Sequence, residues 1–450
     1  MRRQIAFVII ANAIAFATGF LKLWLVACLF GVGAELDGYN LALTLPTFVI
    51  GVASGLLQTG LFPVRARLAR DSAPNDVERF ERTVLLGNVL VGALIALILA
   101  LAVFTIPARV GIDTQSNVWR ATAYVLPYGL ALIPLNALGN AMGYLLAFRG
   151  RYHWFAAAPI ANALFSAGLL AVWPEGGLFN LALGTLLGLA LQVSLCALAL
   201  ERGGFRLTGA LVRARERTKE WREMLRLGGW IFPGILFANL TSTMPIVFAA
   251  SYGEGAVSAF GYAWRLHTYA VQLLIMGMAP VILTRFSELV AQGDWRMVHG
   301  LLNKARWISV SIGVMSVVGV WLAGVPVLEL VFSGRFDATA SRAVAGQWQW
   351  LAFALGPIIL SNVLAKFFQA CGNARLLSVL AAMGFCIFLI VAMSAGPLIG
   401  AHAISVAVAA SAFAMAIVGW GRMNKFTTTK KPLSHYKAKE TELCIKTKSS

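Results

Sequence analysis

Charged residues are scarce in this chain of 450 amino acids. Only 12% of its residues are Asp, Glu, Lys or Arg, whereas 59% are hydrophobic. A soluble domain of this length needs a far larger polar surface, so the composition excludes a soluble fold. Acidic residues are the scarcer class of charge: 19 of them face 37 Lys and Arg, which leaves a formal net charge of +18.

Motifs for catalysis, metal binding and ATP hydrolysis are lacking as well. No GxxxxGK(S/T) loop is present, which argues against ATP-driven transport within the chain. The five histidines show no HxxH or HExxH spacing, and the five cysteines show no paired spacing, so we interpret the cysteines as small apolar packing residues. We expect no metal and no cofactor. With no stretch long enough for a soluble catalytic domain, the chain is not expected to be an enzyme.

Long apolar runs fill almost the whole chain, and each can span about 30 Å of hydrocarbon as a helix. Backbone groups in lipid must be satisfied internally, which favours helices. The first six predicted helices are Ile5 to Leu29, Gly38 to Pro63, Val84 to Ile106, Ala121 to Phe148, Trp154 to Trp173 and Leu178 to Leu200. The second six are Leu227 to Ala250, Ala256 to Leu283, Ile308 to Phe332, Trp350 to Ala370, Leu376 to Met393 and Leu398 to Trp420.

The distribution of Lys and Arg tests this count, because cytoplasmic loops carry the excess of basic residues. With the N-terminus inside, the cytoplasmic segments hold 30 Lys and Arg and the outside loops hold four. One miscounted helix would move every later loop to the other side. We therefore predict an even number of helices with both termini cytoplasmic. Topology accounts for the net charge, so we expect no nucleic-acid partner, although basic loops also favour anionic lipid.

A weak internal repeat divides the chain into two halves. A constant shift of 223 residues places Gly38-Tyr39 on Gly261-Tyr262. We predict an all-α polytopic protein of about 12 transmembrane helices in two six-helix lobes. Its parts would be the N-terminal lobe (1–200), a basic cytoplasmic linker (201–226), the C-terminal lobe (227–422) and a disordered cytoplasmic tail (423–450). An even number of helices in each half gives parallel repeats, which bind substrate between the halves.

Ionisable residues inside predicted helices are the best pointers to a substrate site. Three cations remain after the loops are assigned: Lys22, Arg265 and Lys366. Arg265 lies about nine residues into the eighth helix, where a charge costs about 2.5–3.5 kcal/mol unless it faces water or an anion. Lys22 lies toward the outer end of the first helix and can either snorkel or bind. Lys366 lies near an inner helix end, where snorkelling to the interface is the plainer interpretation.

Acidic and amide residues complete the candidate site. The acidic residues near the membrane fall at outer helix ends, among them Asp37, which can bind substrate or simply N-cap the second helix. Cations without buried carboxylates suit an anionic substrate such as a diphosphate. Asn40 and Asn162 can contact sugar hydroxyls or form hydrogen bonds between helices.

Several short segments resemble one family of transporters, in the same order along the chain. They are Gly19-Phe20-Leu21-Lys22, Phe30-Gly31-Val32-Gly33-Ala34 with Asp37, Leu45-Pro46, Ala158-Pro159 with Asn162, Tyr262-Ala263-Trp264-Arg265-Leu266, Val331-Phe332-Ser333-Gly334-Arg335-Phe336-Asp337, and Phe367-Phe368 leading to Gly372-Asn373-Ala374-Arg375. The pattern resembles the MurJ/MviN lipid II flippases of the MATE-like MOP exporter superfamily.

The resemblance implies a two-lobed bundle whose central arginines meet a lipid diphosphate. Arg265 falls on one family arginine, Lys22 falls where another is usual, and Asp37 matches a family aspartate. Two further family arginines fall on Phe16 and Ile50 here. Typical members also continue to fourteen helices, whereas this chain stops near twelve.

The resulting hypothesis is a flippase for an undecaprenyl-diphosphate-linked saccharide in the bacterial inner membrane. The saccharide is lipid II or an exopolysaccharide or O-antigen repeat unit. The expected partners are that lipid-linked saccharide, membrane lipids and a glycan polymerase or glycosyltransferases. One alternative is a MATE-like, cation-coupled exporter of drugs or other small molecules, which would need a buried carboxylate. A membrane-embedded glycan-assembly enzyme or scaffold would need a catalytic acid or metal set that the sequence does not offer.

Overall fold

The computed structural model describes residues 2–105, 115–205, 218–275 and 279–428, and no strand occurs within these ranges. The helices of the first half are α1 (Arg2–Phe30), α2 (Ala34–Asp71), α3 (Pro74–Thr105), α5 (Asn117–Phe148), α6 (Tyr152–Val172), the short η1 (Pro174–Gly176) and α7 (Gly177–Glu201). Those of the second half are α8 (Thr218–Ala249), the short η4 (Ala250–Tyr252), α9 (Ala256–Ile275), α10 (Ala279–Gln292), α11 (Trp295–Val331), α12 (Ala338–Ala370), α13 (Ala374–Ile399) and α14 (His402–Thr428).

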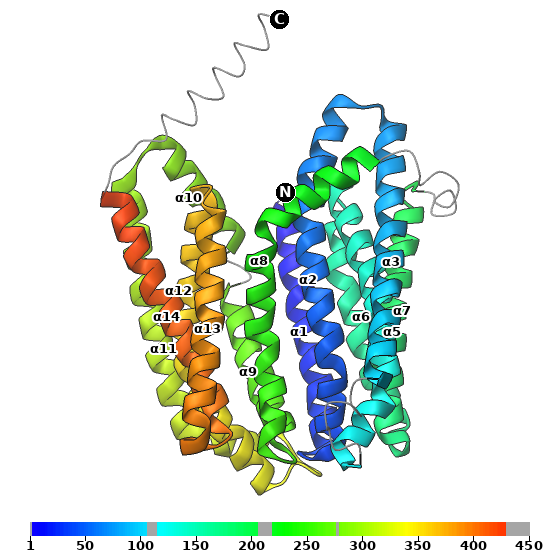
Figure 1. Cartoon of the computed structure of the whole chain (residues 1–450), viewed down its shortest axis with the longest axis vertical. Helices are drawn as coiled ribbons and strands as arrows, with labels where there is room; N and C mark the ends of the chain where they lie inside the picture. Colours follow the sequence, from blue (N-terminus) through cyan, green and yellow to red (C-terminus); the bar gives the residue numbers. More distant parts are fainter. Residues whose placement is uncertain (1, 106–114, 206–217, 276–278, 429–450) are drawn as a thin grey trace, which may run out of the picture.

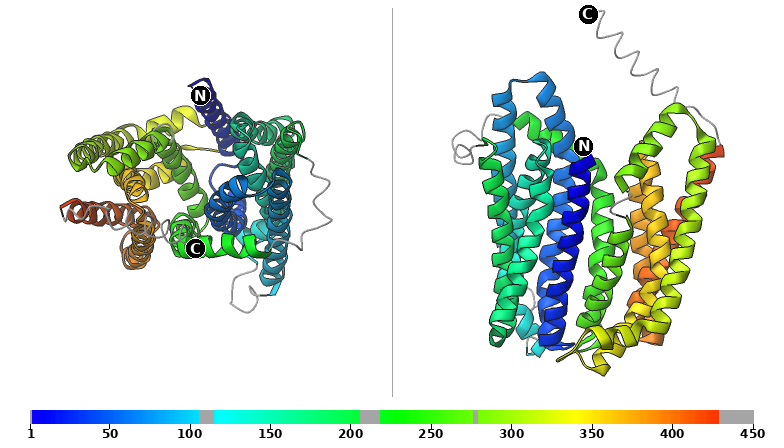
Figure 2. Two further views of the ribbon diagram at one scale, coloured as in Figure 1. Left: turned by 90° about the horizontal axis from the view of Figure 1, so that it is seen from above. Right: turned by 180° about the vertical axis from the view of Figure 1, so that it is seen from behind.

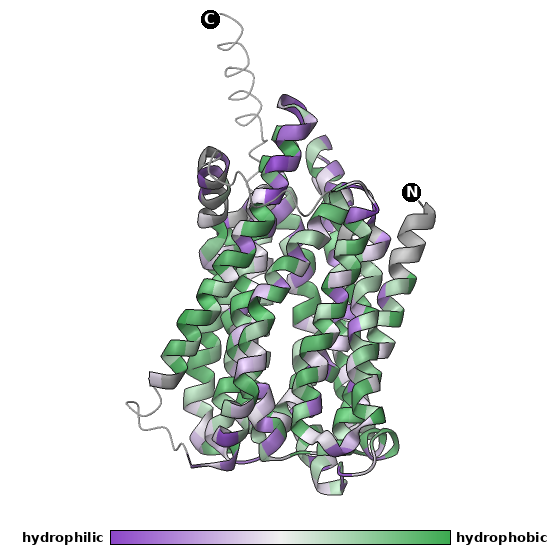
Figure 3. Cartoon of the chain, turned by 90° about the vertical axis from the view of Figure 1, so that its right-hand side faces the viewer, coloured by the Kyte–Doolittle hydropathy of each residue, from purple (hydrophilic) through white to green (hydrophobic). Residues whose placement is uncertain are grey.

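Eleven of these helices are long and apolar enough to cross a membrane, and each matches one predicted segment. Hydrophobic residues cover most of the helix surfaces, and hydrophilic residues gather toward the two ends (Figure 3). The polytopic all-α prediction is therefore confirmed. The helices also run past the apolar segments, because hydropathy marks only the part of a helix that lies in lipid; α11, for example, begins at Trp295 rather than at Ile308.

The eighth predicted helix, Ala256 to Leu283, includes residues 276–278, which lie outside the described part of the chain. Its described residues belong to α9 and α10. Pro280 is the second residue of α10. Proline is tolerated in the first turn of a helix, where its missing N–H is not needed.

The helices form two bundles that lie side by side, α1–α7 in one and α8–α14 in the other (Figure 1). The packing pairs of the first bundle recur in the second. α5 packs against α2, α3 and α7, just as α12 packs against α9, α11 and α14; α1 packs on α6 as α8 packs on α13. This recurrence is what two parallel repeats would produce, and the two-lobed prediction is confirmed.

The bundles meet at one end and separate toward the other (Figures 1 and 2). We call the first the joined end; there, residues 24–37 contact residues 254–262 and 331–335. The opposite, basic end is where α1 begins and α14 finishes. One hydrophobic core spans both bundles and includes Leu36, Phe260 and Phe336. Toward the basic end it gives way to two separate cores, one around Phe80 and one around Phe286. At the basic end α8 still packs on α2, where Met224 joins the core around Phe80, and the other helices of the two bundles separate.

The predicted domain boundaries remain predictions. Residues 206–217 lie outside the described part of the chain, and α8 already begins at Thr218, within the predicted linker. The start of α8 packs on the first bundle, because Glu223 pairs with Arg67 of α2 at 2.6 Å. At the other boundary α14 continues to Thr428, and the remaining residues of the predicted tail are not described.

Candidate functional site

Asp37 lies at the joined end and connects the two bundles. Its side chain is fully buried. One carboxylate oxygen accepts the backbone N–H of Gly255 at 2.5 Å, and the other accepts that of Ser258 at 2.6 Å. These N–H groups belong to the first turn of α9, where the positive end of the helix dipole favours an anion. Gly255 has φ +86°, a conformation that glycine adopts without strain.

This geometry corrects one interpretation of Asp37. The residue does cap a helix, but that helix is α9 of the second bundle and not α2, on which Asp37 itself lies. Neighbouring contacts add to the junction: Gly33 N–H donates to the Ser258 hydroxyl, and Tyr262 donates to the Gly31 carbonyl. A direct substrate contact would require the cap to break. We therefore treat Asp37 as a residue that closes the joined end.

Arg265 stands on α9 and faces α2 across the junction. Its Nη2 donates to Oδ1 of Asn40 at 3.1 Å, and its side chain is half-buried. A Cβ added at Gly261, one turn earlier, would lie 3.2 Å from the Asn40 amide nitrogen. The absence of a side chain at Gly261 therefore lets Asn40 reach across to the arginine.

Lys22 projects from α1 within the first bundle. Its ammonium donates to the Thr185 hydroxyl of α7 at 2.9 Å, and that hydroxyl is also 2.8 Å from the phenol oxygen of Tyr39. A helix rises about 1.5 Å per residue. Lys22, eight residues before the end of α1, thus lies about 12 Å from the joined end, and Arg265, nine residues into α9, lies about 14 Å from it.

The two cations therefore lie at similar depth, close enough for the charge of Arg265 to act on Lys22. Neither forms an ion pair with a carboxylate in the described part of the chain, and the nearby Asp37 is occupied by α9. Tyr269 adds a third hydroxyl within the field of Arg265. Two positive groups surrounded by hydroxyl and amide groups form a site that attracts an anion with several oxygen atoms.

The structure brings three of the predicted site residues into one group, Lys22, Asn40 and Arg265, and places the others elsewhere. Asn162 donates to Gln192 at 3.0 Å between α6 and α7, which is the helix-to-helix role of an amide. Lys366 lies in the last turns of α12 at the basic end and donates to Gln369. Their assignment to substrate binding stays a prediction that this geometry does not favour.

Sequence reasoning missed Thr185 and Tyr39. A threonine in an apolar helix carries no signal of its own, because its hydroxyl satisfies itself on the preceding turn, as Thr185 does on Leu181. Tyr39 did carry a signal: it belongs to the Gly-Tyr pair that recurs as Gly261-Tyr262. Gly261 and Tyr262 lie at the junction, whereas Gly38 packs on α5 and the Tyr39 phenol contacts Thr185 of α7, both within the first bundle.

Phe16 and Ile50 occupy the positions where the family resemblance implies two more arginines, and both side chains pack against hydrophobic or aromatic neighbours. Phe16 packs edge-on against Tyr269, with ring centroids 6.1 Å apart. Ile50 packs against the hydrophobic cores. These two side chains bring no charge, so the cationic group is smaller than the family pattern implies.

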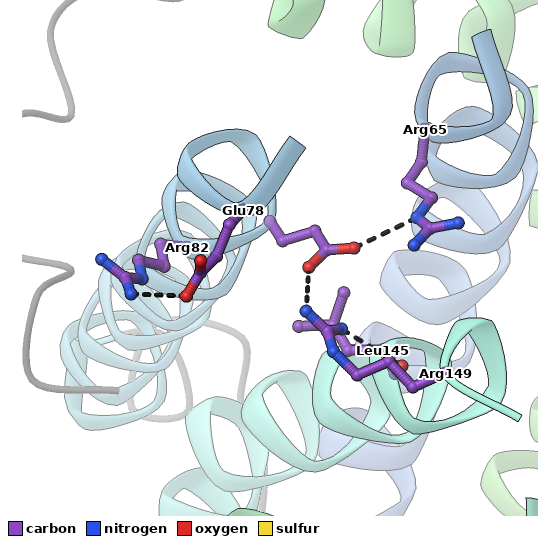
Figure 4. Close-up of polar contacts among 6 residues, drawn as sticks. Arg65, Glu78, Arg82, Leu145 and Arg149 are labelled. Carbon is purple, nitrogen blue, oxygen red and sulfur yellow. Dashed lines mark hydrogen bonds and ion pairs between the residues drawn. The ribbon is translucent and has the colours of Figure 1, made fainter. Parts of the chain in front are cut away.

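A second charged cluster lies at the basic end of the first bundle, around the buried Glu81. One oxygen of Glu81 accepts from Arg65 at 3.1 Å and the other from Arg149 at 2.5 Å, and Arg82 pairs with Glu78 beside them (Figure 4). The cluster borders a pocket of about 330 Å³. Because its arginines are paired with carboxylates, we assign it a structural role in joining α2, α3 and α5.

Metal ligands do not gather at either cluster. Within the residues that the structure describes, no group of three or more His, Cys, Asp or Glu side chains is placed to hold a metal ion. Four of the cysteines, Cys28, Cys196, Cys371 and Cys386, are free thiols, and Cys444 lies outside the described residues.

Comparison with known proteins identifies relatives of this chain in sequence and in fold. Two curated relatives, both named probable lipid II flippase MurJ, are 24% identical to the chain. The protein from Rhizobium meliloti matches over 86% of this chain and 74% of its own length, and that from Synechocystis over 82% and 71%.

Two solved structures share the fold. A lipid II flippase MurJ in an inward closed conformation gives a TM-score of 0.77 at 15% identity, covering 92% of this chain and 87% of its own. An inward-facing MATE family transporter of the MOP superfamily gives 0.78 at 16% identity, covering 94% and 96%. The family model described as lipid II flippase MurJ matches residues 26–446. Since that match spans nearly the whole chain, the protein belongs to the MurJ lipid II flippase family.

Proposed function

We propose that the chain moves an undecaprenyl-diphosphate-linked saccharide from the cytoplasmic to the outer leaflet of the bacterial inner membrane. The observation that carries this proposal is the pair of cations, Lys22 and Arg265, which come from different bundles and have no carboxylate partner among the described residues. Membership of a flippase family and the multi-pass fold support a lipid-linked substrate. A diphosphate supplies the two negative charges and the several oxygen atoms that such a pair requires.

Arg265 is the main diphosphate ligand in this proposal. Its guanidinium has five N–H donors in a planar fork, and within the described residues one side chain, Asn40, accepts from it. Lys22 adds a point charge, while Thr185 and Tyr39 hold its ammonium and offer hydroxyls. Asn40 would orient the guanidinium when the site is empty and can turn to a sugar hydroxyl when it is filled.

Alternating access explains the arrangement of the cores. The bundles share one core at the joined end and have separate cores at the basic end, where α8 is the helix that stays packed on α2. By the positive-inside rule the basic end would be cytoplasmic, so the described state would receive substrate from the cytoplasm. Rocking of the bundles would open the junction at Asp37 and separate the basic halves. A membrane potential negative inside would assist export of the anion by about 2.3 kcal/mol per charge per 100 mV.

The identity of the transported saccharide is a separate part of the proposal. Phe16 and Ile50 remove two charges that the family pattern expects, so an exopolysaccharide or O-antigen repeat unit stands beside lipid II as the cargo. A glycosyltransferase or polymerase partner stays a prediction.

The alternative of cation-coupled drug export gains no support, because Asp37 and Glu81 are both buried and already bonded through both oxygens. The family is one of transporters, and no enzyme activity is proposed.

The test is translocation of a labelled lipid-linked saccharide in vesicles that contain purified protein. Arg265→Ala should abolish transport, and Arg265→Lys should lower it about tenfold, because the charge remains but the fork is lost and a charge-assisted hydrogen bond is worth about 1.5–3 kcal/mol. Arg342→Ala, the same change at an exposed position, is the control and should transport normally. Full transport by Arg265→Ala at equal protein abundance would overturn the proposal.

A further inference from the structure

A groove of about 540 Å³ runs along the outer surface of the second bundle, between α11, α12 and α14. α12 packs against both of the other helices and provides the floor, which includes Phe353 and Pro357. Val314 of α11 and Ile417 of α14 line the walls, with 59% and 67% of their surface exposed. The volume is that of a pocket for one small molecule, about 300–1,000 Å³. Its apolar lining in a membrane protein faces hydrocarbon.

Two glycines shape this groove. A Cβ added at Gly313 of α11 would lie 3.1 Å from the Gly356 Cα, and a Cβ added at Gly356 would lie 2.7 Å from the Ser309 carbonyl oxygen. The backbones of α11 and α12 are thus in direct contact. The two glycines therefore set the close approach of α11 and α12 beside the groove.

A cation stands at one mouth of the groove. The Arg306 guanidinium carbon lies 4.9 Å from the ring centroid of Trp420 and 5.3 Å from that of Trp307. Two tryptophans beside an arginine are typical of the membrane–water interface. Arg306 lies toward the basic end and has no carboxylate partner within the described ranges. Its charge is therefore available to a ligand.

The buried hydroxyl of Ser309 is a second polar group beside the groove. It stands three residues after Arg306 on α11, so both side chains lie on the same face of that helix. Ser309 lines the groove and is only 1% exposed, yet its hydroxyl has no hydrogen-bond partner. An unpaired buried hydroxyl costs free energy. A ligand oxygen in the groove would satisfy it.

From this geometry we propose that the groove binds one anionic glycerophospholipid of the leaflet at the basic end. One acyl chain lies along the floor of α12, and the phosphate sits against Arg306. The Ser309 hydroxyl donates to a phosphate or ester oxygen. Charge complementarity favours this occupant over a helix of a partner protein, because an apolar helix would leave both Arg306 and Ser309 unpaired. The site lies on the outer surface of the second bundle and does not depend on which saccharide is transported.

Native mass spectrometry of the purified full chain tests the proposal, with phosphatidylglycerol and phosphatidylethanolamine of identical acyl chains as probes. The wild type should retain phosphatidylglycerol more strongly. Arg306→Gln should weaken phosphatidylglycerol binding about fivefold, the effect of one basic group near an anionic headgroup, and should leave phosphatidylethanolamine almost unchanged. Lys304→Gln, an exposed charge on the same helix, should change neither.

A groove-filling variant separates the apolar part of the site from the charge. Val314→Trp should lower retention of both lipids, whereas Met315→Trp, 73% exposed and outside the groove, should not. Size-exclusion profiles and melting temperatures verify that each variant is folded. Equal phosphatidylglycerol binding by the wild type and Arg306→Gln would overturn the headgroup assignment. Lipid binding unaffected by Val314→Trp, or a co-purified single-span protein that Val314→Trp displaces in place of lipid, would overturn the proposal as a whole.

Discussion

Removal of the Asp37 carboxylate should shift the protein from the described state toward one in which the joined end is open. In Asp37→Ala the first-turn N–H groups of Gly255 and Ser258 lose their only side-chain acceptor. Both bonds cross between the bundles, so they stabilise only states in which the joined end is closed. The substitution therefore acts on the balance between conformations as well as on stability.

The size of the expected shift in the conformational equilibrium follows from the free energy of the helix cap. Replacing a capping residue by Ala costs about 0.5–2 kcal/mol, and Asp37 belongs at the upper end because both oxygens are bonded and the side chain is fully buried. A loss of about 2 kcal/mol changes a two-state equilibrium about 30-fold. A state too rare to detect in the wild type would then be measurable. Asp37→Asn should give a smaller shift, since its amide oxygen still accepts one N–H.

Distances between two spin labels, measured by double electron–electron resonance, report the shift between the closed and open states of the joined end. Spin labels at Glu175 of η1 and Thr339 of α12, both exposed at the joined end, are introduced into a chain from which the five native cysteines have been removed. Asp37→Ala should add a population at longer distance. Glu35→Ala removes an exposed negative charge from the same turn of α2 and should leave the distances unchanged. Identical distributions for Asp37→Ala and Glu35→Ala would refute the reasoning.

Three further predictions concern the second cation, the charged cluster and the topology. Lys22→Arg should transport normally and Lys22→Glu should fail, because a carboxylate repels the diphosphate; transport by Lys22→Glu in the vesicle assay would contradict this. Glu81→Ala should lower the free energy of unfolding in detergent by about 2–3 kcal/mol, below the usual value for a buried pair because its two arginines are partly exposed. Glu78→Ala, which breaks a partly exposed pair within one helix, should cost at most about 1 kcal/mol, and equal losses would count against a buried anchor. Reporter fusions after Asn424 and within Gly176-Gly177 should report cytoplasm and exterior respectively, and the reverse result would invert the topology.

Hydropathy alone was sufficient to find eleven membrane helices and the all-α class. It is a local property, and a span must be apolar wherever it packs. The family resemblance was likewise readable, and the match over residues 26–446 confirms it. The predicted segment Ala256 to Leu283 corresponds to α9 and α10, with residues 276–278 outside the described part of the chain.

The candidate site was readable only in part. Lys22 and Arg265 stood out because a charge within an apolar helix is costly and calls for a partner. Thr185 and Asn40 were not assigned as their partners, because either side chain satisfies itself equally well within an isolated helix. Only the packing of α7 on α1 and of α9 on α2 selects these contacts.

The clearest contrast is Asp37. Its sequence position near the start of α2 suggested a local cap or a substrate ligand, and both interpretations use only neighbours or family pattern. Its actual partners lie in the other bundle, more than two hundred residues later. Apolar runs and charge placed the helices in the membrane because each helix meets lipid largely on its own. The packing of distant helices decided which polar groups meet across the junction. It also decided where a groove forms beside Arg306, since such contacts exist only after the chain has folded.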